Sequence, residues 1–248
     1  MESIGAQAGK LIAEMEGAAA LDDGARSYLA FHAVRYVLLA ETVGRLVADR
    51  DPSTLRILDV GPAYQTDLFR RLWPAAHVDS LGLADHRFEP RPGERHFEVD
   101  LNAVDASGDG VEDPYDVVVL AEVIEHLSTA AGTVLSFLAS AVASGGYLVV
   151  QTPNAVALPR RLKMLAGRNP AEPIRAGRTN PGHFHEFTAR ELVAEAEQVG
   201  LVPDSVELGN YFVSDQTWRQ RYNRLFGPRL PRNWRDGITA VFRRPNGI

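Results

Sequence analysis

Two carboxylates and an imidazole lie within five residues of one another in the stretch LAEVIEHL, residues 120–127. Glu122, Glu125 and His126 follow the apolar run YDVVVLA, which predicts that they stand where a strand gives way to a helix. If the helix starts at Glu122, the i, i+3, i+4 spacing places all three side chains on one face. Such a set is a suitable partial shell for Mg²⁺ or Mn²⁺, with waters or substrate oxygens as the remaining ligands.

Further ligands and simpler interpretations both exist for this segment. The stretch GHFHEFT, residues 182–188, offers His183 and His185 as a fourth metal ligand. Without a metal, Glu125 would contact substrate, and His126 or His185 would act as a general base, because imidazole titrates near neutrality. The simplest interpretation is a solvated helix start, since acidic residues suit the first turn of a helix.

Strand-length and helix-length patterns alternate along the chain that carries these residues. Residues 7–48 predict two helices separated near LDDG, and a helix TDLFRRLW ends at Pro74. A later helix, STAAGTVLSFLASAVA, has Ser128 as its expected N-cap and ends at Gly145-Gly146. Thr188 and Glu191 form a capping box for the helix TARELVAEAEQVG. The expected strands are LRILDVG, HVDSLGL, RHFEVD, YDVVVLA, YLVVQTPN, LVPDSVELGN and GITAVFRR.

This alternation predicts an α/β protein with a mostly parallel sheet covered on both faces. In such sheets ligands bind beyond the carboxyl ends of the strands, where the residues of interest stand. Gly61 ends the first strand and lets the backbone approach a ligand. Asp85, near the end of the second strand, is placed to accept both hydroxyls of a ribose. Asp100 and Leu101, after the third strand, would bind an adenine amino group and cover one ring face; the alternative for each Asp is a cap or turn.

The order and spacing of these segments resemble the class I S-adenosylmethionine (SAM)-dependent methyltransferases. The resemblance implies a Rossmann-like, seven-stranded sheet whose last strand is antiparallel. It also implies SAM contacts at Asp59, Gly61, Pro62, Ala63, Asp85, Asp100 and Leu101. The matching residues are ILDVG (57–61), LGLAD (81–85), FEVDL (97–101), YDVVVLAEVIEHL (115–127), GGYLVVQTPN (145–154) and HEFTARELVAEAEQVGL (185–201).

The glycine-rich loop departs from the pattern of that family. In DVGPAYQTD the residue Gly61 is kept, but Ala63 and Gln65 stand where further glycines are expected. Gln65 would bring a side chain near the methionine end of the cofactor. Ala84 occupies the usual acidic position and Asp85 follows it. These departures predict altered SAM binding, or a family member that has lost catalysis.

Two branches of the family pair an EVIEH-like segment with a metal. They are the small-RNA 3′-terminal 2′-O-methyltransferases and the ubiquinone-pathway O-methyltransferases. The resemblance to the first branch extends to QTPN (151–154) and to a His before HEFT, and it implies a metal site at Glu122, Glu125, His126 and His183. Both branches act on neighbouring hydroxyls, which a divalent cation would orient and acidify.

Composition narrows the remaining possibilities. The 248 residues include no cysteine, which excludes disulfides, thiolate zinc sites and cysteine nucleophiles. Residues 1–150 hold 11 basic and 23 acidic residues, a net charge of −12, whereas residues 151–248 carry +6. The acidic part argues against broad nucleic-acid contact. The apolar runs are too short to span a membrane, and the acidic start lacks a secretion signal, so we expect a cytoplasmic protein.

The sequence therefore predicts a SAM-dependent O-methyltransferase that acts on a hydroxyl of a small-molecule or sugar-bearing metabolite, with a divalent metal as an optional cofactor. The alternatives are an RNA 3′-terminal ribose 2′-O-methyltransferase and a non-catalytic binding protein with the same fold. Residues 1–50 would form a helical cap, and residues 51–248 the catalytic domain. Insertions at 155–182 and 214–236, rich in Arg and aromatic residues, would form either a lid for an anionic or glycosylated substrate or an exposed face.

Overall fold

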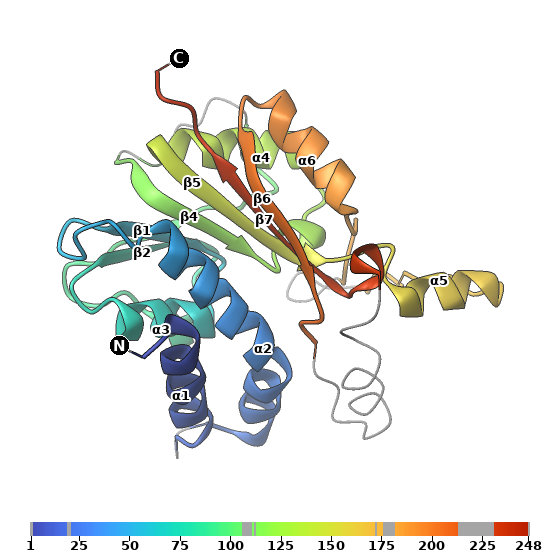
Figure 1. Ribbon diagram of the computed structural model, residues 1–248, viewed down its shortest axis with the longest axis horizontal. Coiled ribbons are helices and arrows are strands. Elements are labelled where there is room, and N and C mark those ends of the chain that lie inside the picture. Colours follow the sequence, from blue (N-terminus) through green and yellow to red (C-terminus); the bar gives the residue numbers. More distant parts are fainter. Residues whose placement is uncertain are drawn as a thin grey trace.

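Seven strands form a single sheet in the computed structural model, which describes residues 2–18, 21–105, 111, 113–171, 173–175, 182–212 and 231–247. The strand order is β3-β2-β1-β4-β5-β7-β6, and β7 runs antiparallel to both of its neighbours while the other pairs are parallel (Figure 1). The Rossmann-like prediction is confirmed. The strands are β1 Arg56–Val60, β2 His77–Gly82, β3 His96–Glu98, β4 Tyr115–Ala121, β5 Val142–Pro153, β6 Val202–Gly209 and β7 Gly237–Arg243.

Helices cover both faces of this sheet. Figure 1 shows α4 and α6 on one side and α1, α2 and α3 on the other. α1 packs outside α2 and α3 and forms with them a second, purely helical core. The helices are α1 Ile4–Glu16, α2 Asp23–Leu46, α3 Tyr64–Leu72, α4 Ala131–Ala141, α5 Leu158–Leu165 and α6 Ala189–Gln198, with short 3₁₀ turns η1 His86–Phe88, η2 Ile124–His126 and η4 Arg232–Trp234.

The central strand β4 shows why the apolar runs are uninterrupted. Val117 and Val119 point into the core shared with α2 and α3, whereas Val118 and Leu120 point into the core shared with α4 and α6. Because both faces of a parallel strand are covered, alternation between apolar and polar residues disappears. The strand therefore delivers the residues after Ala121 to the carboxyl edge of a fully buried sheet.

The helix α2 belongs to the layer that covers the sheet. Leu39 and Val43 pack against Ile57 and Val149 of the central strands. Its earlier turns run toward the carboxyl edge, where Gln151 Nε2 donates a hydrogen bond of 3.5 Å to Arg35 O. The division of the chain at residue 50 stays a prediction, but α2 shares the core of the sheet.

Two sequence-based boundaries near α4 are wrong. Its N-cap is Ala130, and Ser128 instead donates through its backbone N and Oγ to Asn102 Oδ1, at 2.7 and 3.0 Å. Ser128 is therefore hydrogen-bonded to the side chain of Asn102 and does not cap the helix. The strand β5 begins at Val142, three residues before Gly145-Gly146. The ladder between β4 and β5 is irregular in this stretch, and it accommodates Gly145 with its φ of +73°.

The ends of α6 follow the sequence prediction. Thr188 Oγ1 accepts from Glu191 N, and Glu191 Oε2 accepts from Thr188 N, which completes the capping box. Gly200, with φ +81°, follows the last turn. In the part of the chain that the structure describes, every helix is too short or too polar to cross a membrane.

The two insertions are described to different extents. The first contains α5. Most of the second, residues 213–230, lies outside the described residues, and so do Trp218, Tyr222 and Phe226 of the expected lid. Trp234 lies in η4 and is half-buried.

Candidate active site

The turn between β1 and α3 lies at the carboxyl edge of the sheet. Asp59 is fully buried at the end of β1, and its carboxylate accepts a 2.5 Å hydrogen bond from Thr66 Oγ1. Burial raises the pKa of Asp59 to about 7, although this hydrogen bond opposes the shift. Gly61 has φ +75°, and a Cβ there would lie 2.5 Å from Val123 Cγ2. The turn therefore packs directly against the segment that carries Glu122 and Glu125.

We expect Gly61→Ala to destabilise the fold by about 2–4 kcal/mol, because it adds backbone strain and a clash with Val123. Gly93→Ala is the matched control, since Gly93 has φ +91° but no atom within 4 Å of its added Cβ. The control should lose only about 1 kcal/mol from strain. Urea unfolding measures both; equal losses would show that Val123 gives way and that the close packing is not required.

The residues that replace further glycines fill this turn. Ala63 is the extended N-cap residue of α3, and its backbone N donates to Thr66 Oγ1 at 3.0 Å. Pro62 is half-buried beside it. Gln65 is buried, and its Nε2 lies 3.4 Å from both Asp59 Oδ1 and Gly61 O. The Gln side chain thus places an amide against Asp59 and Gly61 of the turn, and its Oε1 has no hydrogen-bond partner among the described residues.

The other three expected cofactor residues lie at the ends of β2 and β3. Asp85 caps η1 and forms an ion pair of 2.6 Å with Arg87, and hydrogen bonds from Arg87 lower its pKa. Asp100 is exposed, and its Oδ1 accepts from Asn102 N at 2.9 Å in a turn. Leu101 is buried. Both carboxylates have the turn-forming contacts that the sequence alternative described, and their contact with SAM stays a prediction.

The EVIEH segment is not a helix from Glu122, so that expectation is wrong. Glu122 has φ +57°, a left-handed conformation, and its backbone N donates to Gln151 O at 2.8 Å. Only Ile124–His126 form a 3₁₀ turn. The β4–β5 ladder extends one residue past β4 through this hydrogen bond, which forces the sharp reversal at Glu122.

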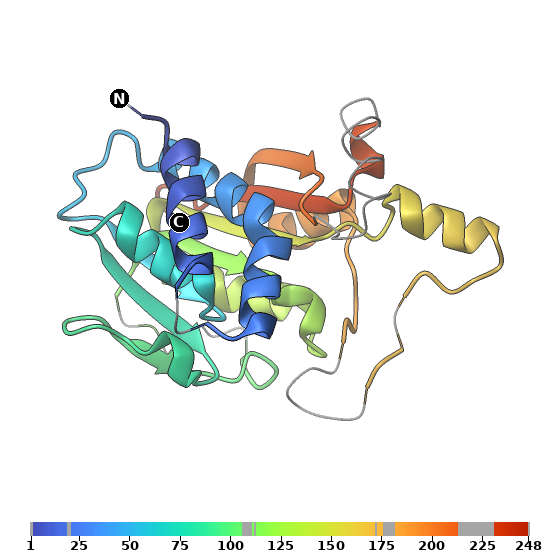
Figure 2. The same cartoon turned by 90° about the horizontal axis from the view of Figure 1, so that it is seen from below.

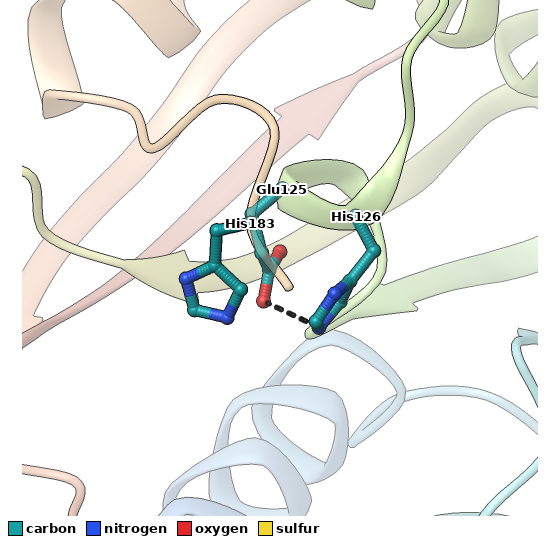
Figure 3. Close-up of side chains that lie close together, drawn as sticks. All are labelled: Glu125, His126 and His183. Atoms are coloured by element: carbon teal, nitrogen blue, oxygen red, sulfur yellow. Dashed lines mark ion pairs between the residues drawn. The ribbon is translucent and has the colours of Figure 1, made fainter. Parts of the chain in front are cut away.

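Three of the four predicted metal ligands nevertheless converge. Glu125, His126 and His183 each offer one ligand atom, and these atoms all lie within 4.8 Å of one another. Figure 3 shows the three side chains gathered around one point, with the dashed line joining His126 Nε2 to Glu125 Oε1 at 4.0 Å. The backbone holds the two segments together, since Phe184 N donates to Glu125 O at 2.8 Å. Glu122 lies outside this group of three.

Each imidazole of the cluster is oriented by a hydrogen bond from its Nδ1. His126 Nδ1 donates to Gly182 O at 2.9 Å, and His183 Nδ1 donates to Glu186 Oε1 at 2.6 Å. Such bonds fix the tautomer and leave Nε2 with a free lone pair, as in most metal-binding histidines. Glu186 is in turn paired with Arg160 of α5. Burial alone would raise the pKa of Glu186, but His183 and Arg160 lower it.

We expect Glu186→Ala to weaken Mn²⁺ binding by about 10–100-fold, because His183 loses the partner that sets its orientation. Glu186→Gln should lose less, since the amide oxygen can still accept from His183 Nδ1. Glu197→Ala, on the exposed face of α6, is the control. Calorimetric titration with Mn²⁺ measures all three, and an affinity for Glu186→Ala equal to that of the control would remove Glu186 from the site.

The surroundings of Glu122 and Glu125 disfavour the charged form of each carboxylate. Glu125 is fully buried; its Oε2 accepts from Thr152 Oγ1 at 2.9 Å, while its Oε1 has no hydrogen-bond partner among the described residues. Burial raises the pKa values of both Glu122 and Glu125, and their mutual repulsion raises that of Glu122 further. The buried guanidinium of Arg35, on α2, opposes both shifts. A cation placed among these groups would stabilise the charged carboxylates.

His185, a predicted catalytic residue, is not part of the cluster. Its side chain is exposed, its ring packs 4.5 Å from that of Phe187, and its charge acts on Glu191 at the start of α6. The structure therefore places it near the start of α6 and outside the group of Glu125, His126 and His183. Its role as a base stays a prediction that this position does not favour.

Three residues near the cluster were missed from the sequence. Thr152 lies in the QTPN stretch and Glu186 in HEFT, so their motifs were noted without a role for either side chain. Arg35 gave no signal, because an Arg in a helix is usually solvated. Only the fold shows that its helix crosses the carboxyl edge of the sheet.

The fold of the chain and the family model that matches it together define the class of this protein: it is a Rossmann-like, SAM-dependent methyltransferase. The sequence model of the methyltransferase domain matches residues 31–206. The chain belongs to the methyltransferase domain family. No curated protein matches the sequence.

Solved structures share the fold at low sequence identity. The magnesium protoporphyrin IX methyltransferase from Synechocystis PCC 6803, with bound SAH, is 14% identical with a TM-score of 0.56, over 97% of this chain and 94% of that one. An S-adenosylmethionine dependent methyltransferase from Mesorhizobium loti is 15% identical with a TM-score of 0.52, over 81% and 96%. The N-methyltransferase NodS from Bradyrhizobium japonicum WM9, with SAH, is 13% identical with a TM-score of 0.50, over 96% and 99%.

Proposed function

We propose that this methyltransferase transfers the methyl group of SAM to a hydroxyl of a small molecule with two neighbouring oxygens, a catechol or a vicinal diol, and that a divalent cation assists. The observation that carries the proposal is the convergence of Glu125, His126 and His183 beside the β1–α3 turn. Gly61, one of the expected SAM residues at this turn, packs against Val123 of the same segment.

The donor set fits Mg²⁺ or Mn²⁺. The buried Oε1 of Glu125 has no hydrogen-bond partner in the described part of the chain, and leaving a buried carboxylate oxygen without one is costly. A cation held by Glu125, His126 and His183 would satisfy this oxygen, orient the two substrate oxygens and lower the pKa of the attacking hydroxyl. Carboxylate and imidazole ligands are compatible with Mn²⁺, and with Mg²⁺ when waters complete the shell.

The protein's own side chains supply the positioning. Thr152 and Gly182 hold Glu125 and His126, and Glu186 holds His183, so the three groups are fixed before substrate arrives. Burial lowers the pKa of His126, and this shift favours the neutral imidazole that a cation requires. Methyl transfer needs the acceptor oxygen in line with the methyl group, and rigid placement provides much of the acceleration.

The test combines cation binding with methyl transfer. Metal-stripped protein is mixed with isotope-labelled SAM and either catechol or phenol, with and without Mg²⁺ or Mn²⁺. We expect transfer to catechol that requires the cation, and much slower transfer to phenol. Equal transfer with and without the cation would remove the metal from the proposal. Transfer to the 3′ end of a short RNA but not to catechol would replace the small molecule by a terminal ribose.

A further inference from the structure

The helix α5 projects from the carboxyl edge of the sheet. Figures 1 and 2 show it extending away from the rest of the molecule in both views. It begins five residues after the end of β5, and none of its eight residues is buried. Its contact with the body runs through Arg160, so packing against the described residues does not explain its exposed apolar side chains.

Large apolar side chains of α5 face solvent. The exposed fractions are 55% for Leu162, 62% for Met164 and 84% for Leu165. Leu158, Leu162 and Leu165 stand at i, i+4 and i+7 and so share one side of the helix. Arg160 lies on the opposite side, where it pairs with Glu186 of the body. On the apolar side Leu162 and Leu165 face solvent, whereas Leu158 at the start of the helix is half-buried.

The charge of this region is opposite to that of the body. Residues 155–171 contain four basic residues and no acidic one, whereas residues 1–150 carry −12. Lys163 and Arg168 are exposed and have no ion-pair partner in the described part of the chain. Apolar side chains flanked by cations are complementary to a surface that has anionic groups at the outside and an apolar layer below them. The acidic part of the chain, residues 1–150, would be repelled by the same surface, which favours an approach through α5.

We propose that α5 docks the carboxyl edge of the domain onto an anionic lipid surface. Leu162 and Leu165 enter the boundary between headgroups and acyl chains, and Lys163 and Arg168 pair with lipid phosphates. An eight-residue helix is about 12 Å long, which suits shallow insertion in the plane of the surface. The contact is reversible, because the buried area of so short a helix is small. This inference does not depend on the metal or on the acceptor of the methyl group.

The experiment is sedimentation of the full chain with phosphatidylcholine vesicles, with and without phosphatidylglycerol. We expect binding only to the anionic vesicles, and weaker binding as salt rises. The double variant Leu162→Glu/Leu165→Glu should bind at least about 10-fold more weakly. Val202→Glu, at an exposed apolar position on β6 that is 52% exposed, should bind as wild type does. Circular dichroism confirms that each variant is folded.

Three results would overturn the proposal. The first is a wild-type protein that does not bind anionic vesicles at low salt. The second is equal loss of binding in the α5 variant and in the Val202→Glu control, which would make the effect one of charge alone. The third is self-association in sedimentation velocity that the α5 substitutions abolish while vesicles bind nothing, which would make a second copy of the chain the occupant.

Discussion

Glu125→Gln should weaken Mn²⁺ binding by about 100-fold or more and lower kcat/KM for a diol acceptor by roughly 10³-fold. The substitution removes the charged ligand, but it keeps the shape of the side chain and an oxygen that can accept from Thr152 Oγ1. The carboxylate is fully buried, so a neutral amide relieves a desolvation cost. The metal-free variant should therefore unfold at the same or a higher urea concentration than wild type at pH 8.

Calorimetry with Mn²⁺ and a methyl-transfer assay separate the possible roles of Glu125. Glu89→Gln is the control, since the side chain of Glu89 is 71% exposed and lies outside the cluster. If Glu125→Gln keeps wild-type Mn²⁺ affinity but loses activity, Glu125 acts on substrate protons and is not a ligand. If both are unchanged, the cluster has no part in the reaction.

Arg35→Met should destabilise the metal-free protein by about 3–5 kcal/mol at pH 8, because it leaves two buried carboxylates without their cation. Arg35 is 1% exposed, and its charge lowers the pKa values of Glu122 and Glu125 against the effect of burial. Arg45→Met, on the same helix, is the matched control. Its side chain is 56% exposed and pairs with Glu207, so the loss should be about 1 kcal/mol or less.

The stability lost in Arg35→Met should depend on pH, and the direction of that dependence follows from the pKa values of Glu122 and Glu125. Both carboxylates have folded-state pKa values above their unfolded ones, and the loss of Arg35 raises them further. Near pH 5 the folded variant keeps protons on Glu122 and Glu125, so the missing positive charge matters less. The difference in unfolding free energy from wild type should therefore grow as pH rises from 5 to 8. Addition of Glu125→Gln should recover part of it at pH 8, and a constant difference across this range would contradict the electrostatic explanation.

The architecture was predictable from the sequence because the strands are apolar on both faces and the helices have clear ends. β4 and the capping box of α6 are examples, and each is determined by residues close in the chain. The start of β5 was not predictable in this way. Gly145-Gly146 usually ends an element, but here pairing of Val142 with Tyr115 carries the strand through them.

The candidate site was predictable in its residue types and not in its geometry. The i, i+3, i+4 spacing suggested a helix from Glu122, whereas a long-range hydrogen bond to β5 holds that residue in a left-handed conformation. The cluster forms through a tertiary contact between the turn and the segment of His183. The role of Arg35 could not be predicted from the sequence, because only the packing of α2 across the sheet brings its guanidinium to the carboxylates.

The contact between Arg160 and Glu186 joins α5 to His183 through three consecutive side chains. A shift of α5 must therefore move the carboxylate that sets the orientation of this imidazole. Coupling free energies are reciprocal, so if an occupied α5 strengthens cation binding, a bound cation must strengthen docking of α5 by the same factor. If both sites are occupied as proposed, the ion pair would let the occupancy of one site change the affinity of the other.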